Sequence, residues 1–170
     1  MAILNPRSKK RNIWALSVLA LLLVPVLAVW SPALRSTRNA LATSDTFVLY
    51  SLAPYYEDSA SNHPRYFYNS RIMGQTQIID PRLKSQLVDS LCDSLRPNQT
   101  FGAACLAPRY AIHATKGWRT IDVIICFDCA NVVFRQYGKS SRIIPMESTS
   151  ARAIYDRVLQ QAGVPQSKRQ

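Results

Sequence analysis

The hydrophobic pattern of the chain begins with one uninterrupted apolar run. Ile13–Trp30 comprises eighteen residues without a charged side chain, and as a helix it would span about 27 Å, close to the thickness of a bilayer. Trp14 and Trp30 stand at its two ends, where indole rings favour the membrane–water interface. Four basic residues precede the run and two follow it. The pattern therefore predicts a transmembrane helix over 13–30 and a cytoplasmic N-terminus over 1–12.

A cleaved signal peptide is the alternative interpretation of the same run. It shares the basic start, and Val26-Leu27-Ala28 places small residues where cleavage requires them. A retained anchor is favoured because the apolar run continues to Trp30 before a polar segment begins. Both interpretations place the rest of the chain outside the cytoplasm. In a bacterium the anchor would lie in the inner membrane and the domain in the periplasm.

Residues 31–64 are predicted to form a tether and a membrane-proximal arm. The stretch "SPALRSTRNALATSD" is polar and rich in small residues, and "EDSASNHP" is a second loop-like stretch. Between them "TFVLYSLAPYY" is apolar and aromatic. It is expected to form either a strand or arm that packs on the domain, or an interfacial segment near the bilayer.

Residues 65–165 are predicted to form the compact domain. The stretch "RYFYNSRIMGQTQII" is typical of a strand that is broken or bulged near Gly74. A helix follows, with Asp80 as its cap and Pro81 in its first turn. Its apolar residues recur at helical spacing: Leu83, Leu87, Val88, Leu91 and Leu95.

In the rest of the domain, stretches rich in apolar residues alternate with turns. "ACLAPRYAIHA" and "RTIDVIICF" predict two strands joined by a hairpin turn at 115–118, and "ANVVFRQY" and "GKSSRIIP" predict further strand. A final helix is expected to begin near Ser150 and to end at Gly163, and 166–170 form a basic tail. The order β-α-β-β-(β)-α predicts an α+β fold, in which two helices pack on one face of a mainly antiparallel sheet.

The net charge of +11 suggests nucleic-acid binding, but its distribution argues against that class. Eight basic residues lie outside 45–165, near the apolar run or at the C-terminus. Inside that span thirteen basic residues face ten acidic ones, a net charge of only +3. A protein that follows a phosphate backbone needs a continuous basic stripe. We therefore expect no nucleic-acid partner.

The four cysteines admit several interpretations. If the hairpin turns at 116–117, a register slip of one residue sets Cys105 opposite Cys129, near bridging distance. An even cysteine count in a small exported domain favours a structural disulfide. We expect this bridge between Cys105 and Cys129, with Cys126 as the alternative partner. In an extended strand Cys126 and Cys129 would lie about 10 Å apart, so they could bond only if the strand turned at 127–128.

Thiol-redox chemistry and metal binding are the competing uses of the cysteines. The C-x-x-C of redox enzymes begins a helix, whereas here β-forming residues follow it. A metal site could draw on Cys105, Cys126, Cys129 and His113, or on Cys92 in place of the histidine, but a second closely spaced pair is lacking. Cys92 lies on the apolar stripe of the predicted helix, where its default role is that of a small buried hydrophobe. Free buried thiols are the remaining alternative.

Other candidate chemistry is sparse. The predicted hairpin places Arg109, His113 and Asp122 on one face, where a carboxylate between two cations could contact an anion or a partner, or orient a proton transfer. The alternative is a solvated cross-strand charge cluster of little energetic weight. No serine or cysteine stands in an evident arrangement with His and Asp, and no phosphate-binding loop is present. The sequence therefore predicts no enzyme activity and no cofactor.

Three separated motifs carry a resemblance to a known class of proteins. "CLAPRYAIHA", "TIDVIICFDC" and "AIYDRVLQQAGVP" follow one another as they do in small exported bacterial domains that occur mostly as hypothetical lipoproteins. The resemblance covers roughly residues 70–165 and implies an α+β fold and an exported location, but no activity. This chain lacks the cysteine to which a lipid would be attached, which favours the membrane helix as its anchor.

The sequence as a whole predicts a non-catalytic, membrane-anchored extracytoplasmic interaction domain. Its partners would be the bilayer, through Ile13–Trp30, and other subunits of a larger membrane complex. The alternative function is a thiol-redox or metal-handling protein that uses Cys105, Cys126 and Cys129.

Overall fold

The computed structural model describes most of the chain beyond residue 31. The described residues are 32–53, 65–96, 107–138, 141–147 and 149–167. The chain divides into two compact units, Met1–Arg35 and Ser36–Gln170, and the following account concerns the second. Among the described residues, no helix is long and apolar enough to cross a membrane. The predicted span Ile13–Trp30 lies outside the described residues.

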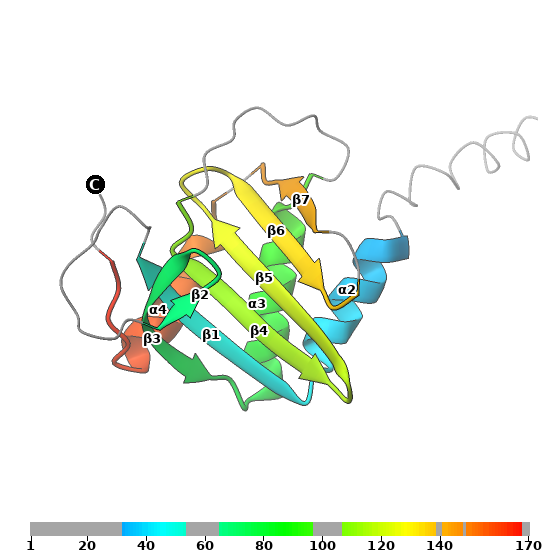
Figure 1. Ribbon diagram of the computed structural model, residues 1–170, viewed down its shortest axis with the longest axis horizontal. Helices are drawn as coiled ribbons and strands as arrows, with labels where there is room; N and C mark the ends of the chain where they lie inside the picture. Colours follow the sequence, from blue (N-terminus) through cyan, green and yellow to red (C-terminus); the bar gives the residue numbers. More distant parts are fainter. Residues whose placement is uncertain (1–31, 54–64, 97–106, 139–140, 148, 168–170) are drawn as a thin grey trace, which may run out of the picture. The chain divides into compact units, whose positions relative to one another are not determined.

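The second unit is an α+β domain built on one antiparallel sheet (Figure 1). In chain order the described elements are α2 (Pro32–Ala42), whose first residues belong to the first unit, β1 (Thr46–Ala53), β2 (Tyr66–Phe67), β3 (Ser70–Gln77), α3 (Pro81–Ser94), β4 (Tyr110–Lys116), β5 (Arg119–Cys126), β6 (Asn131–Gln136), β7 (Arg142–Pro145) and α4 (Arg152–Gln161). The strand order in the sheet is β2-β3-β1-β4-β5-β6-β7. The predicted α+β class and the antiparallel sheet are confirmed, with three helices among the described residues where two were expected in the domain.

The sheet begins earlier in the chain than predicted. Strand β1, which the sequence assigned to a tether over 31–64, pairs with β3 on one side and with β4 on the other. Its side chains alternate between the two faces, and Phe47 and Leu49 are fully buried. The expectation of a strand that packs on the domain is confirmed for β1, whereas the polar stretch before it, which was expected to belong to the tether, forms helix α2. Residues 54–64 lie outside the described residues.

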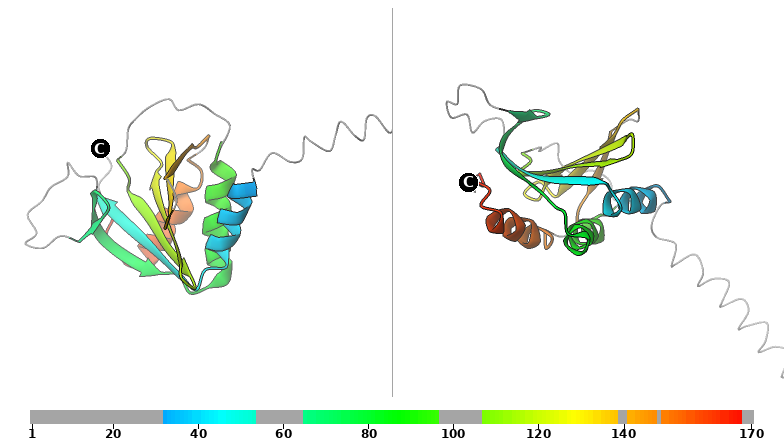
Figure 2. Two further views of the ribbon diagram at one scale, coloured as in Figure 1. Left: turned by 45° about the vertical axis from the view of Figure 1, so that its right-hand side comes forward. Right: turned by 90° about the horizontal axis from the view of Figure 1, so that it is seen from below.

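Helices α3 and α4 cover one face of the sheet (Figure 2). Helix α3 begins as predicted: the Asp80 carboxylate accepts a hydrogen bond from the Arg82 N–H at 2.9 Å, and Pro81 occupies the first turn. Its apolar stripe and that of α4 form the core together with the inward-facing strand residues. The fully buried members include Leu87, Val88, Leu91, Ile112, Val123, Tyr155 and Leu159.

Helix α4 ends as the sequence indicates but begins differently. Gly163 follows it with a φ of +66°, a conformation that suits glycine. The helix begins at Arg152, and no side chain caps it. The N-cap position therefore falls on Ala151, one residue after Ser150. The Ala151 carbonyl accepts the Ile154 and Tyr155 N–H groups.

Two details of register can be compared with the prediction. The predicted irregularity near Gly74 is confirmed, because Ser51 pairs with Gly74 while Leu52 pairs with Ile72, which leaves one extra residue in β3. The β4–β5 hairpin, in contrast, turns at Gly117-Trp118 instead of 116–117. Gly117 has a φ of +55°, and its N–H donates to the Asp45 carboxylate at 2.7 Å. This contact with the start of β1 favours the observed turn.

Candidate functional site

The outer face of the sheet, opposite α3 and α4, carries a groove. The short strand β2 stands off from this face and forms a wall beside it (Figure 2). The groove has a volume of about 660 Å³, which lies within the usual range for small-ligand sites. Its lining residues are Tyr66, Phe67, Tyr68, Asn69, Ser70, Pro108, Ile124 and Arg135. We call this feature the outer groove.

Aromatic rings form the wall of the outer groove. The Phe67 ring lies 5.0 Å from the Tyr50 ring of β1 and 5.2 Å from the Tyr68 ring, measured between centroids. Tyr68 has a φ of +52°, which is unusual for a residue with a side chain and marks the tight turn between β2 and β3. Tyr66 and Tyr68 remain nearly half exposed. The groove therefore offers ring faces and hydroxyl groups to an occupant.

A row of polar side chains crosses the sheet at one end of the groove. His113, Asp122 and Arg135 occupy directly paired positions on β4, β5 and β6. The Asp122 carboxylate lies 2.7 Å from His113 Nδ1 and accepts a hydrogen bond from the Tyr68 hydroxyl, also at 2.7 Å. The Arg135 guanidinium stacks over the Tyr68 ring at 4.3 Å. One carboxylate thus connects the wall of the groove to its floor.

The environment of Tyr68 holds its hydroxyl in the neutral form. Desolvation, together with the hydrogen bond to Asp122 and the negative charge of that carboxylate, raises the pKa of Tyr68 to about 12. The Tyr68 hydroxyl is therefore a hydrogen-bond donor at every physiological pH. When Asp122 is ionised, His113 donates from Nδ1, and in the neutral imidazole Nε2 is then the acceptor. An Asp–His pair of this kind can orient an imidazole, but a reacting group beside it is needed for catalysis.

The predicted group of Arg109, His113 and Asp122 is only partly assembled. His113 and Asp122 meet, as the hairpin predicts. Arg109 lies elsewhere: its Nε donates to the Asp128 carboxylate at 3.1 Å and its Nη1 to the Ser167 hydroxyl at 2.5 Å. The reason is that Arg109 precedes β4, where the chain has left the regular alternation of the strand.

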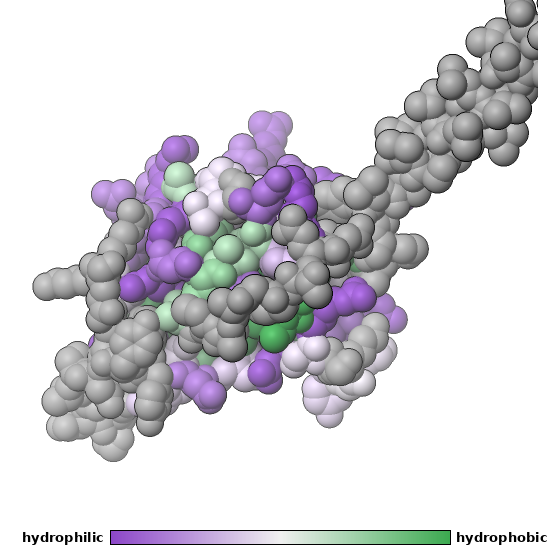
Figure 3. All heavy atoms as spheres, turned by 90° about the horizontal axis from the view of Figure 1, so that it is seen from above, coloured by the Kyte–Doolittle hydropathy of each residue, from purple (hydrophilic) through white to green (hydrophobic). Residues whose placement is uncertain are grey.

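The disulfide predicted between Cys105 and Cys129 is not formed. The structure bonds Cys129 to Cys126, with 5.2 Å between the Cα atoms, and Cys105 lies outside the described residues. Strand β5 ends at Cys126, and residues 127–130 turn into β6, so the cysteines approach each other as only a turn allows. Ala130 completes the turn with a φ of +51°. Figure 3 looks onto this end of the domain, where apolar residues lie between hydrophilic ones.

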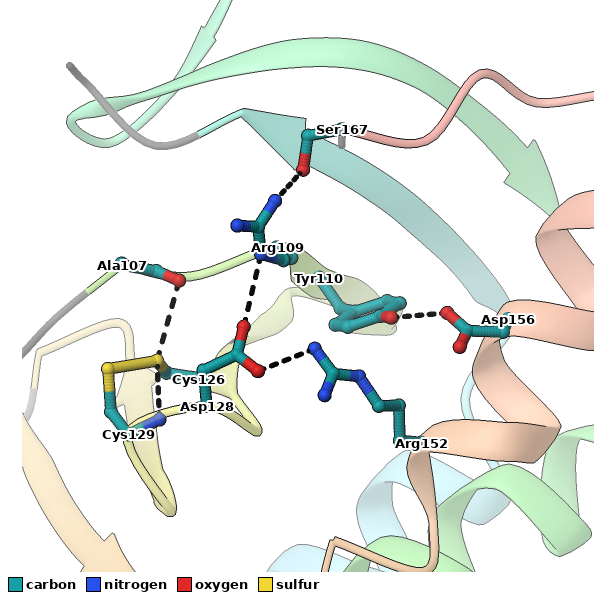
Figure 4. A network of polar contacts seen from close by, with 9 residues as sticks. All are labelled: Ala107, Arg109, Tyr110, Cys126, Asp128, Cys129, Arg152, Asp156 and Ser167. Carbon is teal, nitrogen blue, oxygen red and sulfur yellow. Dashed lines mark hydrogen bonds and ion pairs between the residues drawn. A yellow bond between two sulfur atoms is a disulfide. The ribbon is translucent and has the colours of Figure 1, made fainter. Parts of the chain in front are cut away.

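Ion pairs fasten the disulfide turn to the rest of the domain (Figure 4). Asp128, within the turn, accepts from Arg109 at 3.1 Å and from Arg152 Nη2 at 2.7 Å. Partial burial disfavours the charge, yet the hydrogen bonds and charges of Arg152 and Arg109 outweigh it, and the pKa of Asp128 is lowered. Tyr110 donates to Asp156 beside this pair. The turn is therefore connected to the start of α4 and, through Arg109, to the C-terminal segment.

Among the described residues, the predicted metal ligands do not come together; Cys105 lies outside them. Asp122, the partner of His113, lies four residues before Cys126 on β5, a separation of about 13 Å along a strand. In the part of the chain that the structure describes, no group of three His, Cys, Asp or Glu side chains could hold a metal ion. Cys92 is buried, as predicted, and desolvation raises the pKa of its thiol to about 12. The thiol of Cys92 is thus protonated and unreactive.

Sequence reasoning missed several members of the two polar networks. Tyr68 stands within a stretch assigned to one strand, and only the Tyr68-Asn69 pair hinted at a turn. Arg135 is the first exposed residue after four buried residues of β6, so only its charge indicated a place outside the core. Arg152 gave no signal, because its contact with Asp128 depends on how α4 packs.

Comparisons with known proteins give no family. No family model matches the sequence, and no curated protein matches it either. Among solved structures the chain is similar to the crystal structure of a "Putative Lipoprotein from Clostridium perfringens", with a TM-score of 0.46 and 10% sequence identity, covering 75% of this chain and 93% of that chain. A likeness of this size assigns neither a family nor an activity.

Proposed function

We propose that the chain is a non-catalytic, exported domain that Ile13–Trp30 holds at the membrane, and that it binds another protein as an accessory subunit of a membrane complex. The observation that carries this proposal is the outer groove. A strand of only two residues, β2, forms a wall that adds nothing to the core, and it holds Tyr66 and Tyr68 nearly half exposed beside the sheet. Aromatic side chains of this kind are enriched at protein interfaces.

The charges of the outer groove indicate which kind of segment it would bind. No described carboxylate lies within ion-pair distance of Arg135, whose guanidinium stacks on Tyr68. The Asp122 carboxylate, in contrast, already accepts the Tyr68 hydroxyl and contacts His113. A partner segment with a carboxylate beside an apolar side chain would therefore place the carboxylate on Arg135 and the apolar group against the rings.

The experiment uses the full chain purified from its own membranes in mild detergent, with a photo-crosslinking phenylalanine in place of Tyr66. We expect a native complex larger than the monomer and one crosslinked partner. Arg135→Gln should abolish the crosslink, whereas Arg157→Gln, on the exposed side of α4, should retain it. A free monomer without a crosslinked partner would refute the proposal.

The disulfide turn favours thiol-redox exchange as a second candidate function. Cys126 and Cys129 form a C-x-x-C disulfide, and the Cys129 N–H lies 3.2 Å from Cys126 Sγ as a donor. The same N–H would stabilise a Cys126 thiolate after reduction. Equilibration in glutathione buffers, followed by thiol counting, tests this function. A redox protein should be reduced between about −270 and −120 mV, whereas a disulfide that persists under mild reduction is structural.

A further inference from the structure

The three most exposed large apolar side chains gather at one end of the sheet. Ile79, Trp118 and Tyr137 are 80%, 81% and 84% exposed, whereas the remaining exposed apolar residues stay below 50%. A fully exposed tryptophan forgoes roughly 2–3 kcal/mol of burial free energy, so its place at a turn calls for an explanation. We call Ile79, Trp118 and Tyr137, with the adjoining turns, the Trp118 edge.

The antiparallel topology brings these residues together. Strands β3, β4 and β6 end at this side, and β1, β5 and β7 begin there; Figure 1 shows the ends of β3 and β4 and the starts of β1 and β5 along its lower side. Trp118 lies in the β4–β5 turn and Tyr137 directly follows β6. The Tyr137 N–H approaches the Thr120 carbonyl at 3.4 Å, which places the two turns side by side. Ile79 lies in the connection from β3 to α3.

Hydrogen bonds hold the central turn of this edge in place. The Gly117 N–H donates to the Asp45 carboxylate at 2.7 Å, and Lys116 Nζ donates to the Thr43 hydroxyl at 2.6 Å. Both contacts tie the turn that carries Trp118 to the connection between α2 and β1. The indole is therefore presented by a braced turn instead of a loose loop.

The charges of the Trp118 edge are mainly positive. Lys116, Arg119 and Arg82 are exposed there, and the Arg119 guanidinium lies 5.3 Å from the centre of the Trp118 ring. The carboxylates at this edge, Asp45 and Asp80, already accept backbone N–H groups. Exposed Trp and Tyr rings among Lys and Arg are the combination that favours the interface of an anionic bilayer.

We infer that the Trp118 edge lies on the surface of a bilayer containing anionic lipids, with the Trp118 and Tyr137 rings among the headgroups. This contact uses neither the outer groove nor the disulfide turn. A protein partner fits less well, because turn tips give a small, convex contact area, whereas stable protein interfaces bury about 800 Å² per partner.

The test uses the full chain reconstituted into vesicles. Trp14→Tyr and Trp30→Tyr leave Trp118 as the single tryptophan and retain an interfacial ring at each end of the anchor. Fluorescence is recorded in vesicles of 70% phosphatidylcholine and 30% phosphatidylglycerol, with and without 6,7-dibrominated acyl chains. We expect the bromines to quench Trp118 and its emission to shift to the blue relative to detergent. Quenching should fall at least twofold in pure phosphatidylcholine and on Arg119→Gln.

A matched control places the tryptophan in the outer groove. In the same background, Trp118→Phe with Tyr66→Trp should show no quenching by brominated chains, because Tyr66 lies on the wall of the groove. Circular dichroism verifies that each variant is folded. Two results would overturn the inference: an unquenched Trp118 with the same emission as in detergent, or a blue-shifted Trp118 that brominated chains do not quench, which would indicate burial against protein.

Discussion

The disulfide turn is held to the rest of the domain by the ion pairs of a single side chain. Asp128 is the one carboxylate of this turn, and it receives Arg109 from the start of β4 and Arg152 from α4. Removal of its charge would leave two arginines that are 10% and 18% exposed without their shared acceptor. Because two cations contact the same carboxylate, we expect its loss to lower the stability more than the loss of an ordinary surface aspartate would.

Asp128→Asn should lower the free energy of unfolding by about 1 kcal/mol at pH 7, a value kept small because the carboxylate is partly exposed to solvent. The pKa of Asp128 is lowered in the folded state. Its stabilisation is therefore present above the unfolded pKa of about 3.9 and is lost as the pH falls through the lower folded value. Urea unfolding at pH 7 and pH 3 measures the difference. Asp93→Asn, on the exposed face of α3, is the control; an equal loss from both variants would contradict the argument.

The cysteine pairing also belongs to the residue scale. Peptide mapping by mass spectrometry without reductant should recover Cys126 linked to Cys129 and a free Cys92. Replacement of both bridged cysteines by serine should cost at most about 2 kcal/mol, because the bond closes a loop of only a few residues. A bridge from Cys105 to Cys129 would show that the original sequence-based pairing was correct.

At the scale of elements, the bulge in β3 and the C-terminal segment depend on one glycine. A Cβ at Gly74 would lie 2.8 Å from Val164 Cγ1 and 3.2 Å from Pro165 Cδ. The segment after α4 therefore packs on the backbone of β3 more closely than any other residue would allow. This contact explains why residue 74 is glycine within a strand.

Gly74→Ala should destabilise the domain by about 1–3 kcal/mol, the usual cost of overpacking. The double variant Gly74→Ala with Val164→Ala should recover part of this loss, because it removes the methyl group nearest to the new Cβ. Thermal unfolding of the two single variants and the double variant gives the coupling. Strictly additive effects would show that the two residues do not compete for the same space.

The domain as a whole needs β1, although the sequence-based boundary at residue 65 left this strand outside the compact domain. β1 supplies the ladder partners of both β3 and β4. Ser44 and Arg38 add contacts from the α2 side, the former through its carbonyl to Lys84 at 2.6 Å and the latter to Asp89 at 2.9 Å. A chain that lacked these residues would leave two strand edges and the core open.

Two truncated chains test where the domain begins. One starting at residue 36, the boundary of the second compact unit, should unfold cooperatively on heating. One starting at residue 65, the sequence-based boundary, should lack a cooperative transition and aggregate through the exposed edges. Calorimetry measures both. A cooperative transition in the shorter chain would restore the predicted boundary.

Local patterns determined much of the fold. The cap at Asp80, the apolar stripe of α3, the irregularity at Gly74 and the end of α4 at Gly163 each follow from residues adjacent in sequence. The antiparallel α+β class follows from the order of these elements. The apolar run Ile13–Trp30 predicts an anchor on the same local grounds, and it lies outside the described residues.

Only the tertiary structure decided which distant residues meet. The cysteine pairing depended on whether β5 turns after Cys126, and the hairpin register depended on Asp45 reaching Gly117. The contact of Tyr68 with Asp122 likewise joins the β2–β3 turn to β5, and the two residues are 54 positions apart in the sequence. Propensity and periodicity act over a few residues, whereas these contacts are selected by packing between elements. The candidate site was therefore predicted only in the part, His113 and Asp122, that a single hairpin assembles.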